Sequence, residues 1–249
     1  MKERIKQLQY SNNVFSKFLF LLCKAIYIIV STLFNSKNRA VFLSGIIYFK
    51  NYAQRATYTL ENRYPLIFSE VSKYLENLET PHILSYGCST GEEVKSLGEY
   101  MPQAIVYGAE INNWCLKQCK KNNQSNLHFF YHINSKAFKN LNNLDAIFCM
   151  AVFQHTINRT DKLKTTTSKF TFQQFEQQLI LLDSKLKVDG LLIIDHCDFD
   201  FTETIVAAKY KPLLFEGNSL KRVRPLFNQF NKKISLETEL NRVFVKIMA

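Results

Sequence analysis

The fold is decided by the stretch His82-Ile-Leu-Ser-Tyr-Gly87-Cys-Ser-Thr-Gly91-Glu-Glu93. An apolar run of strand length leads into small residues and then into a segment with helical spacing. Gly87 and Gly91 lack a Cβ, so the chain can bend sharply and a bound group can approach the backbone. Ser89 and Thr90 are predicted to cap the helix that follows. The free N–H groups at such a helix start suit polar or anionic ligand groups.

Beyond this stretch, apolar runs alternate with helical segments. The predicted strands are 82–86, 104–109, 127–133, 144–151 and 190–194, and the helices end near 100, 121 and 186. Near-continuous apolar strands joined by helices indicate a parallel sheet covered on both faces. Residues 212–215 and 242–248 are predicted to add an antiparallel pair. The predicted fold class is therefore α/β: a Rossmann-like, doubly wound, mainly parallel seven-stranded sheet with an N-terminal helical extension.

The chain divides into three parts. Residues 1–40 are basic and apolar, residues 41–80 are predicted to form a helical lid or cap, and residues 81–249 form the sheet domain. Tyr58, Arg63 and Tyr64 are candidates for a lid that closes over a ligand, although packing is the commoner role of such aromatic residues.

Residues 14–34 are apolar almost throughout and approach the length of a membrane-spanning helix. Lys17, Lys24 and Ser31 recur every seven residues, so they form one narrow polar stripe on a helix. A helix lying on an anionic membrane surface uses such lysines well. A helix packed on the domain or on a partner chain, and a true span, are the alternatives. The expected location is the cytoplasm, with peripheral attachment to the inner face of a membrane.

The formal net charge is +11 over 249 residues. This balance favours anionic partners, such as nucleic acid, acidic lipid headgroups or an acidic substrate, without choosing among them. The six cysteines include no C-x-x-C pair and no zinc-ligand spacing, so we expect reduced thiols and no metal site. The loop lacks both the G-x-G-x-x-G dinucleotide motif and the P-loop motif.

Glu110 gives the loop a more specific interpretation. It ends the second predicted strand, and the carboxyl ends of parallel strands gather at the edge of the sheet where ligands bind. A carboxylate at this place can accept hydrogen bonds from the two vicinal hydroxyls of a ribose.

These residues resemble the class I S-adenosylmethionine-dependent methyltransferases. Residues 87–93 look especially like the cofactor loop of the chemotaxis-receptor methyltransferases, a subset of that superfamily. Residues 145–155 resemble the fourth-strand motif of the superfamily, and residues 187–194 its fifth-strand motif. The resemblance covers about residues 80–197.

The resemblance implies S-adenosylmethionine as the cofactor and assigns roles to residues. Four loop residues would line its methionine end and ribose, Glu110 would hold the ribose hydroxyls, and Ile111 would pack on the adenine. Asn134 would lie near the adenine amino group, and Met150 and Ala151 near the sulfonium. The loop residues are Gly87, Cys88, Ser89 and Gly91. Ser85 stands where many members have an acidic residue, and Glu92 is the predicted substitute.

The chemistry implied is in-line transfer of a methyl group, in which alignment supplies much of the acceleration. A base is needed only if the acceptor must lose a proton. His155 is the first candidate for this base and His196 the second. The alternative for each histidine is a purely structural role. A metal at His196, Asp198 and Asp200 is not predicted, because such acidic residues often cap turns.

The acceptor is predicted to be small or lipid-like, because the N-terminal region is apolar and phenylalanine is abundant. The basic segment 221–225 would also fit RNA, but no RNA-binding module is recognisable, so nucleic acid is not favoured. A protein acceptor is a further alternative. Two non-catalytic alternatives are a cofactor-binding sensor and a membrane-associated interaction protein.

Overall fold

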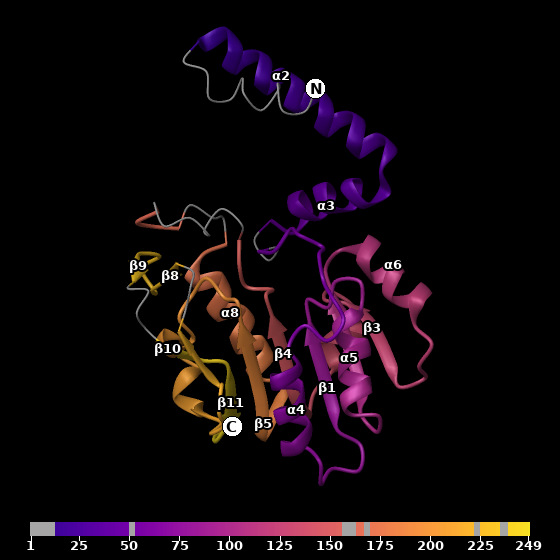
Figure 1. Ribbon diagram of the computed structural model, residues 1–249, viewed down its shortest axis with the longest axis vertical. Coiled ribbons are helices and arrows are strands. Elements are labelled where there is room, and N and C mark those ends of the chain that lie inside the picture. The colour runs from indigo at the N-terminus through magenta and orange to yellow at the C-terminus, as the bar shows by residue number, and fades with distance from the viewer. Residues whose placement is uncertain (1–12, 50–52, 156–162, 167–169, 222–224, 235–238) are drawn as a thin grey trace.

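The computed structural model describes residues 13–49, 53–155, 163–166, 170–221, 225–234 and 239–249. A seven-stranded sheet lies at its centre (Figure 1). In spatial order the strands are β3 (His128–His132), β2 (Ile105–Glu110), β1 (His82–Tyr86), β4 (Leu144–Met150), β5 (Leu186–Asp195), β11 (Val243–Lys246) and β6 (Tyr210–Pro212). The first five strands are parallel, and β11 runs antiparallel to both β5 and β6. The predicted fold class is confirmed.

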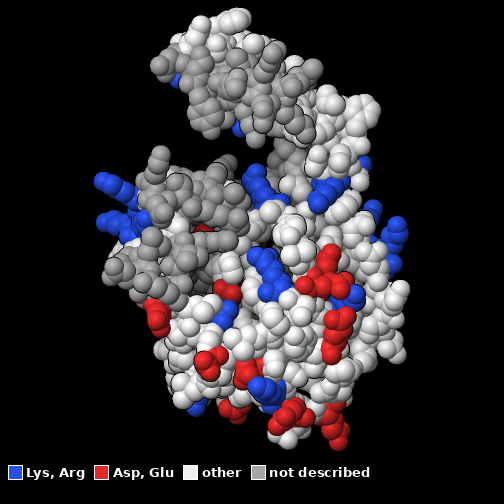
Figure 2. Space-filling view, in the orientation of Figure 1, with Lys and Arg blue, Asp and Glu red and all other residues white. Residues whose placement is uncertain are grey.

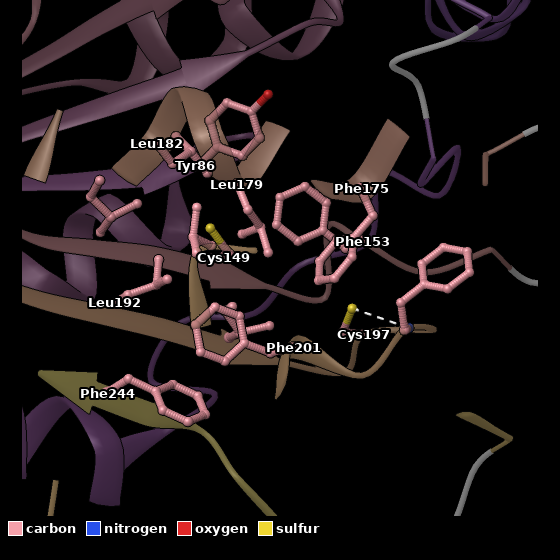
Figure 3. Close-up of a cluster of buried hydrophobic side chains, with 14 of the residues drawn as sticks. Tyr86, Cys149, Phe153, Phe175, Leu179, Leu182, Leu192, Cys197, Phe201 and Phe244 are labelled. Atoms are coloured by element: carbon pink, nitrogen blue, oxygen red, sulfur yellow. Dashed lines mark hydrogen bonds between the residues drawn. The ribbon is translucent and has the colours of Figure 1, made fainter. Parts of the chain in front are cut away.

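Helices cover both faces of the sheet because successive strand residues point to opposite sides. One core contains Leu84, Ile147 and Leu192 together with residues of α7 (Lys136–Asn140) and α8 (Phe172–Asp183). Figure 3 shows part of this core, where aromatic rings from α8 and the loop after β4 meet the strands.

The other face of the sheet packs against three helices. This second core contains the neighbouring strand residues Ile83, Phe148 and Ile193. The helices are α4 (Pro65–Tyr74), α5 (Glu92–Tyr100) and α6 (Asn113–Asn122). Successive residues of a strand point alternately into the two cores, which explains why the strands are apolar without a break.

Two details differ from the sequence prediction. The predicted capping by Ser89 and Thr90 is wrong: Gly91, at φ 101°, occupies the N-cap of α5 without a side-chain bond. Strand β5 begins at Leu186 rather than at 190, because Leu186 pairs with Leu144 before the ladder resumes at Leu191. The intervening residues bulge out of the ladder, with Asp189 at φ 62°.

The C-terminal part adds small elements around the sheet. Two short antiparallel pairs form there, and two 3-10 turns lie between β5 and β6. The pairs are β7 (Ser219–Lys221) with β10 (Glu239–Asn241) and β8 (Leu226–Phe227) with β9 (Lys233–Ile234). The turns are η2 (Phe201–Glu203) and η3 (Ala207–Lys209).

The N-terminal extension consists of α2 (Val14–Phe34) and α3 (Ser36–Ile47). Helix α3 contacts α6, whereas α2 projects away from the sheet domain (Figure 1). None of the 21 residues of α2 is buried. Within the described residues, α2 is the one helix long and apolar enough to cross a membrane. Because α3 leads into residues 53–64, the extension lies on the side of the domain where the strands β1, β2 and β4 end.

Candidate cofactor and acceptor site

A cavity of about 190 Å³ lies at the carboxyl ends of β1, β2 and β4. The chain between α3 and α4 forms one wall of it, and α5, α6 and α8 each add a side chain. Its lining comprises Ala53, Gln54, residues 56–60, Arg63, Tyr64, Phe68, residues 86–89, Glu93, residues 110–112, Cys115, Ile133, residues 150–152, Gln154 and Gln178. This is the edge at which open parallel sheets bind ligands.

Glu110 is held at this edge by three backbone N–H groups. Ser89 donates to Oε2 (2.9 Å), while Ile111 (2.8 Å) and Asn112 (2.7 Å) donate to Oε1. Burial raises the pKa of Glu110, and the three N–H donors oppose that rise by stabilising the charged form. A carboxylate has about four acceptor positions, so this one keeps capacity on Oε2 for a ligand hydroxyl.

The turn after β1 brings the backbone against this carboxylate. Gly87 adopts φ 78°, and its N–H donates to the carbonyl oxygen of Ala109 (2.8 Å). A Cβ on Gly87 would lie 2.4 Å from Cγ2 of Val152. Gly87 is therefore required both by its positive φ and by the close approach of the loop after β4.

Gly87→Ala is expected to destabilise the fold by about 2–4 kcal/mol, because strain at positive φ adds to a clash with Val152. Urea unfolding measures this change. Gly45→Ala in α3 is the control and is expected to stay within about 1 kcal/mol, because its new Cβ would meet only the flexible side chain of Arg55. Adding Val152→Ala should restore part of the loss; no restoration would contradict the clash.

Glu93 faces the cavity from the first turn of α5. Its Oε1 accepts a hydrogen bond from the Ser85 hydroxyl (2.7 Å). Burial raises the pKa of Glu93 to about 7, although the Ser85 hydroxyl and the charge of Arg63 act in the opposite direction. Glu92, the predicted substitute for an acid at position 85, instead accepts a hydrogen bond from the Thr90 hydroxyl and does not line the cavity. Because α5 starts later than predicted, Glu93 points toward the sheet and Glu92 does not.

Glu93→Gln is expected to stabilise the protein by about 2 kcal/mol at pH 8 and by less at pH 5. The folded-state pKa of about 7 lies above the ordinary value of 4.5, so the wild type loses stability as the pH rises through this window. Glutamine carries no charge and escapes that loss. Urea unfolding at both pH values tests this, with Glu99→Gln on the exposed side of α5 as control. An equal change in both variants would contradict the assignment.

The structure brings seven of the predicted cofactor residues to one cavity. They are Gly87, Cys88, Ser89, Glu110, Ile111, Met150 and Ala151. Ala151 adopts φ 60°, an uncommon value for a residue other than glycine. Gly91 caps α5 instead of lining the cavity, and a Cβ there would lie 3.4 Å from Sγ of Cys119.

Three other predicted residues lie outside the cavity lining. Asn134 is exposed, and its neighbour Ile133 contributes to the wall. The backbone N–H of His155 donates to Asp198 (2.7 Å), and Nδ1 of His196 lies 3.1 Å from Oδ1 of Asp195. The loops after β4 and β5 carry both histidines away from the cavity wall.

The structure places the predicted lid candidates Tyr58, Arg63 and Tyr64 at the cavity. Sequence reasoning missed the carboxamides Gln54, Gln154 and Gln178. Residues 53–60 form no helix or strand, so no periodicity marks them. Among the described residues, no group of three or more His, Cys, Asp or Glu side chains could hold a metal ion. Asp200 accepts a hydrogen bond from the Thr202 N–H at the start of η2, which is the turn-capping role expected from the sequence.

Residues 84–167, which supply most of the strand-end walls, match the family described as a methyltransferase domain. This match covers about a third of the chain. The matched region begins within β1 and runs past β4, so it includes the loop, Glu110 and Ala151. No curated protein matches the sequence.

Several solved structures are similar to this chain at low sequence identity. The plantazolicin methyltransferase BpumL in complex with SAH is 15% identical, with 78% of this chain and 60% of that chain covered and a TM-score of 0.38. PKMT2 from Rickettsia typhi in complex with AdoHcy is 17% identical, with 53% and 24% covered and a TM-score of 0.38. YJHP from E. coli is 17% identical, with 63% and 55% covered and a TM-score of 0.37. This chain thus spans less than two thirds of each protein, and likeness at this level says nothing about its acceptor.

Proposed function

We propose that the protein transfers a methyl group from S-adenosylmethionine to a small or lipid-like acceptor. The observation that carries this proposal is the Glu110 carboxylate, which lines the cavity and is fixed by three backbone N–H groups. Such a group suits the paired hydroxyls of a ribose. The residues present therefore fit this cofactor.

Charged groups in the same cavity suit the other end of the cofactor. Arg63 and Glu93 both line it, and the charge of Arg63 acts on Glu93. The methionine end carries a carboxylate and an ammonium group, so Arg63 would hold the first and Glu93 the second. Gly87, Cys88 and Ser89 would line the space between this end and the ribose. Glu93 would then take the role that the sequence analysis predicts for Glu92, as the substitute for an acidic residue at position 85.

The remaining walls would position the adenine and the reacting methyl group. Ile111 would pack on the adenine, and Met150 and Ala151 would border the sulfonium. Bound S-adenosylmethionine supplies a methyl group on a good leaving group, so the work of the protein is alignment and exclusion of water. The segment 53–64, which connects α3 to α4, would cover the acceptor side of the cavity.

Two measurements test this function. Titration with S-adenosylhomocysteine and S-adenosylmethionine tests the cofactor site, and absence of binding by both would refute the proposal. Transfer of labelled methyl groups into fractionated cell extract shows whether the acceptor is a lipid, a metabolite, RNA or protein. Tight binding without transfer to any fraction would favour a cofactor-binding sensor.

We also propose that α2 attaches the enzyme to the inner face of the cytoplasmic membrane. Its apolar side chains are exposed, with Phe15 71%, Leu21 60% and Phe34 86% accessible to solvent. A helix packed on the sheet domain would bury such residues. On the face drawn in Figure 2, lysine and arginine atoms lie mainly in the half nearer α2, and most acidic atoms lie in the other half. This polarity suits an anionic membrane surface.

A further inference from the structure

The two ends of the cavity differ in chemistry. Arg63, Glu93 and Glu110 give it charged groups that the proposed function assigns to the cofactor. The part of the lining formed by segment 53–54, the loop after β4 and α8 carries neutral side chains: Ala53, Gln54, Tyr86, Val152, Gln154 and Gln178. Two of these carboxamides converge on one point, because Gln54 Nε2 (3.5 Å) and Gln154 Nε2 (3.2 Å) donate to the carbonyl oxygen of Ala151.

Gln178 has an unused hydrogen-bond donor in this neutral region. The side chain comes from α8, is 8% exposed, and accepts a hydrogen bond from the Tyr86 hydroxyl at Oε1 (3.0 Å). Its Nε2 is buried and has no hydrogen-bond partner within the described part of the chain. A buried amide nitrogen without an acceptor opposes folding, so a residue that keeps one in a cavity wall is suited to an oxygen of a ligand.

We propose that Gln178 is the specificity-determining residue for the acceptor, and that the acceptor is a carboxylic acid with an apolar body, the fatty-acid class. The Nε2 group donates to one carboxylate oxygen and leaves the other free to react. Since the reaction needs the methyl donor, this proposal rests on the proposed function.

No histidine lines the described cavity, and its two carboxylates, Glu93 and Glu110, are assigned to the cofactor, which favours a carboxylate acceptor over an alcohol or an amine. Neither His155 nor His196 reaches the cavity, and Tyr86 stays neutral because burial raises its pKa above the usual value. A carboxylate is already ionised at neutral pH and needs no base. Its oxygen forms the new bond to the methyl carbon, the bond from that carbon to sulfur breaks, and the electron pair stays on sulfur. The products are a neutral ester and a neutral thioether, and no proton moves.

Charge supports the same acceptor class. A carboxylate is attracted to a sulfonium, and the two charges decrease together in the transition state, which a dry cavity favours over water. The apolar body has a place as well, since Ala53, Leu60 and Val152 also line the cavity. The exposed apolar α2 places this protein where amphiphilic acids concentrate.

The test uses the full chain with dodecanoic acid, dodecanol and dodecylamine as matched acceptors. Labelled methyl transfer should yield methyl dodecanoate and neither of the other products. Gln178→Leu should lower kcat/KM for the acid by about 10- to 100-fold, the effect expected from the loss of one hydrogen bond to a charged group. Gln178→Glu should lower it further, because a carboxylate there repels the acceptor. Gln177→Leu, at an exposed position on the same helix, is the matched control.

Binding measurements separate this proposal from the cofactor assignment. Calorimetric titration of the protein loaded with S-adenosylhomocysteine should show dodecanoate binding that Gln178→Leu weakens, with S-adenosylhomocysteine affinity unchanged. Cofactor binding without methyl dodecanoate formation would overturn the carboxylate proposal and leave the cofactor site standing. Equal kcat/KM in Gln178→Leu and Gln177→Leu would overturn the role of Gln178. Failure to bind S-adenosylhomocysteine would overturn both proposals.

Discussion

Glu110→Ala is expected to weaken the binding of S-adenosylhomocysteine by about 10- to 100-fold. The hydrogen bond from a ribose hydroxyl to the remaining acceptor position on Oε2 is worth about 1.5–3 kcal/mol, and it is lost. The backbone N–H groups of Ser89, Ile111 and Asn112 lose their acceptor at the same time. The turn after β1 is therefore expected to loosen, and the protein should unfold at lower urea concentration.

Two variants separate the loss of the ligand contact from the loss of the turn. Glu110→Gln keeps one acceptor oxygen for the N–H groups but replaces the other with a donor, so it should still weaken binding by tenfold or more. Glu99→Ala, on the exposed face of α5, should bind like the wild type. Calorimetric titration gives the affinities. Wild-type affinity in Glu110→Ala would place the ribose elsewhere.

The sheet could be predicted from the sequence because its strands are buried on both faces. Strand β1 was predicted at 82–86 and forms at His82–Tyr86, and β2 forms at Ile105–Glu110 within one residue of its predicted start. Apolar runs of this length between turn residues are typical of strands buried on both faces. Glu110 could be placed for the same reason, since a carboxylate directly after a buried strand must lie at the sheet edge.

The rest of the site depends on contacts that leave no local pattern. Which of Glu92 and Glu93 faces the cavity depends on the residue at which α5 begins. The positive φ angles of Ser89 (50°) and Gly91 (101°) determine that start. Gln178 lies 92 residues from Tyr86 in the chain, and only the packing of α8 on the sheet brings them together. Asn134 was misplaced because β3 ends early, at His132, and Ile133 reaches the cavity instead.

Helix α2 carries the second large expected effect. The double variant Leu21→Glu/Ile29→Glu should abolish flotation of the protein with vesicles that contain phosphatidylglycerol. Burial of one large apolar side chain in the interface is worth about 1.5–3 kcal/mol, so loss of two of them lowers partitioning by about 100-fold or more. Both side chains are exposed, at 60% and 58%, so the change should not disturb the sheet domain.

The control is a double variant that introduces two glutamates outside α2. Ile205 and Leu214 are exposed apolar residues of the sheet domain, at 69% and 93%, and Ile205→Glu/Leu214→Glu should float like the wild type. Loss of flotation in both double variants would show that net charge, and not α2, governs membrane binding. Flotation of the α2 variant at the wild-type level would refute the membrane proposal.

The manner of attachment follows from the behaviour in salt and alkali. Twenty-one residues at about 1.5 Å each give a helix close to the thickness of the hydrocarbon core, which is about 30 Å. Lys24, near the middle of α2, would then lie within the core, which favours a helix in the interface with Lys17 and Lys24 directed to headgroups. Such a helix should be released by high salt at alkaline pH, because ionic contacts are screened and the apolar contact is shallow. Retention under these conditions would instead show that α2 spans the bilayer and that the cavity lies beside a lipid phase from which an amphiphilic acceptor can be drawn.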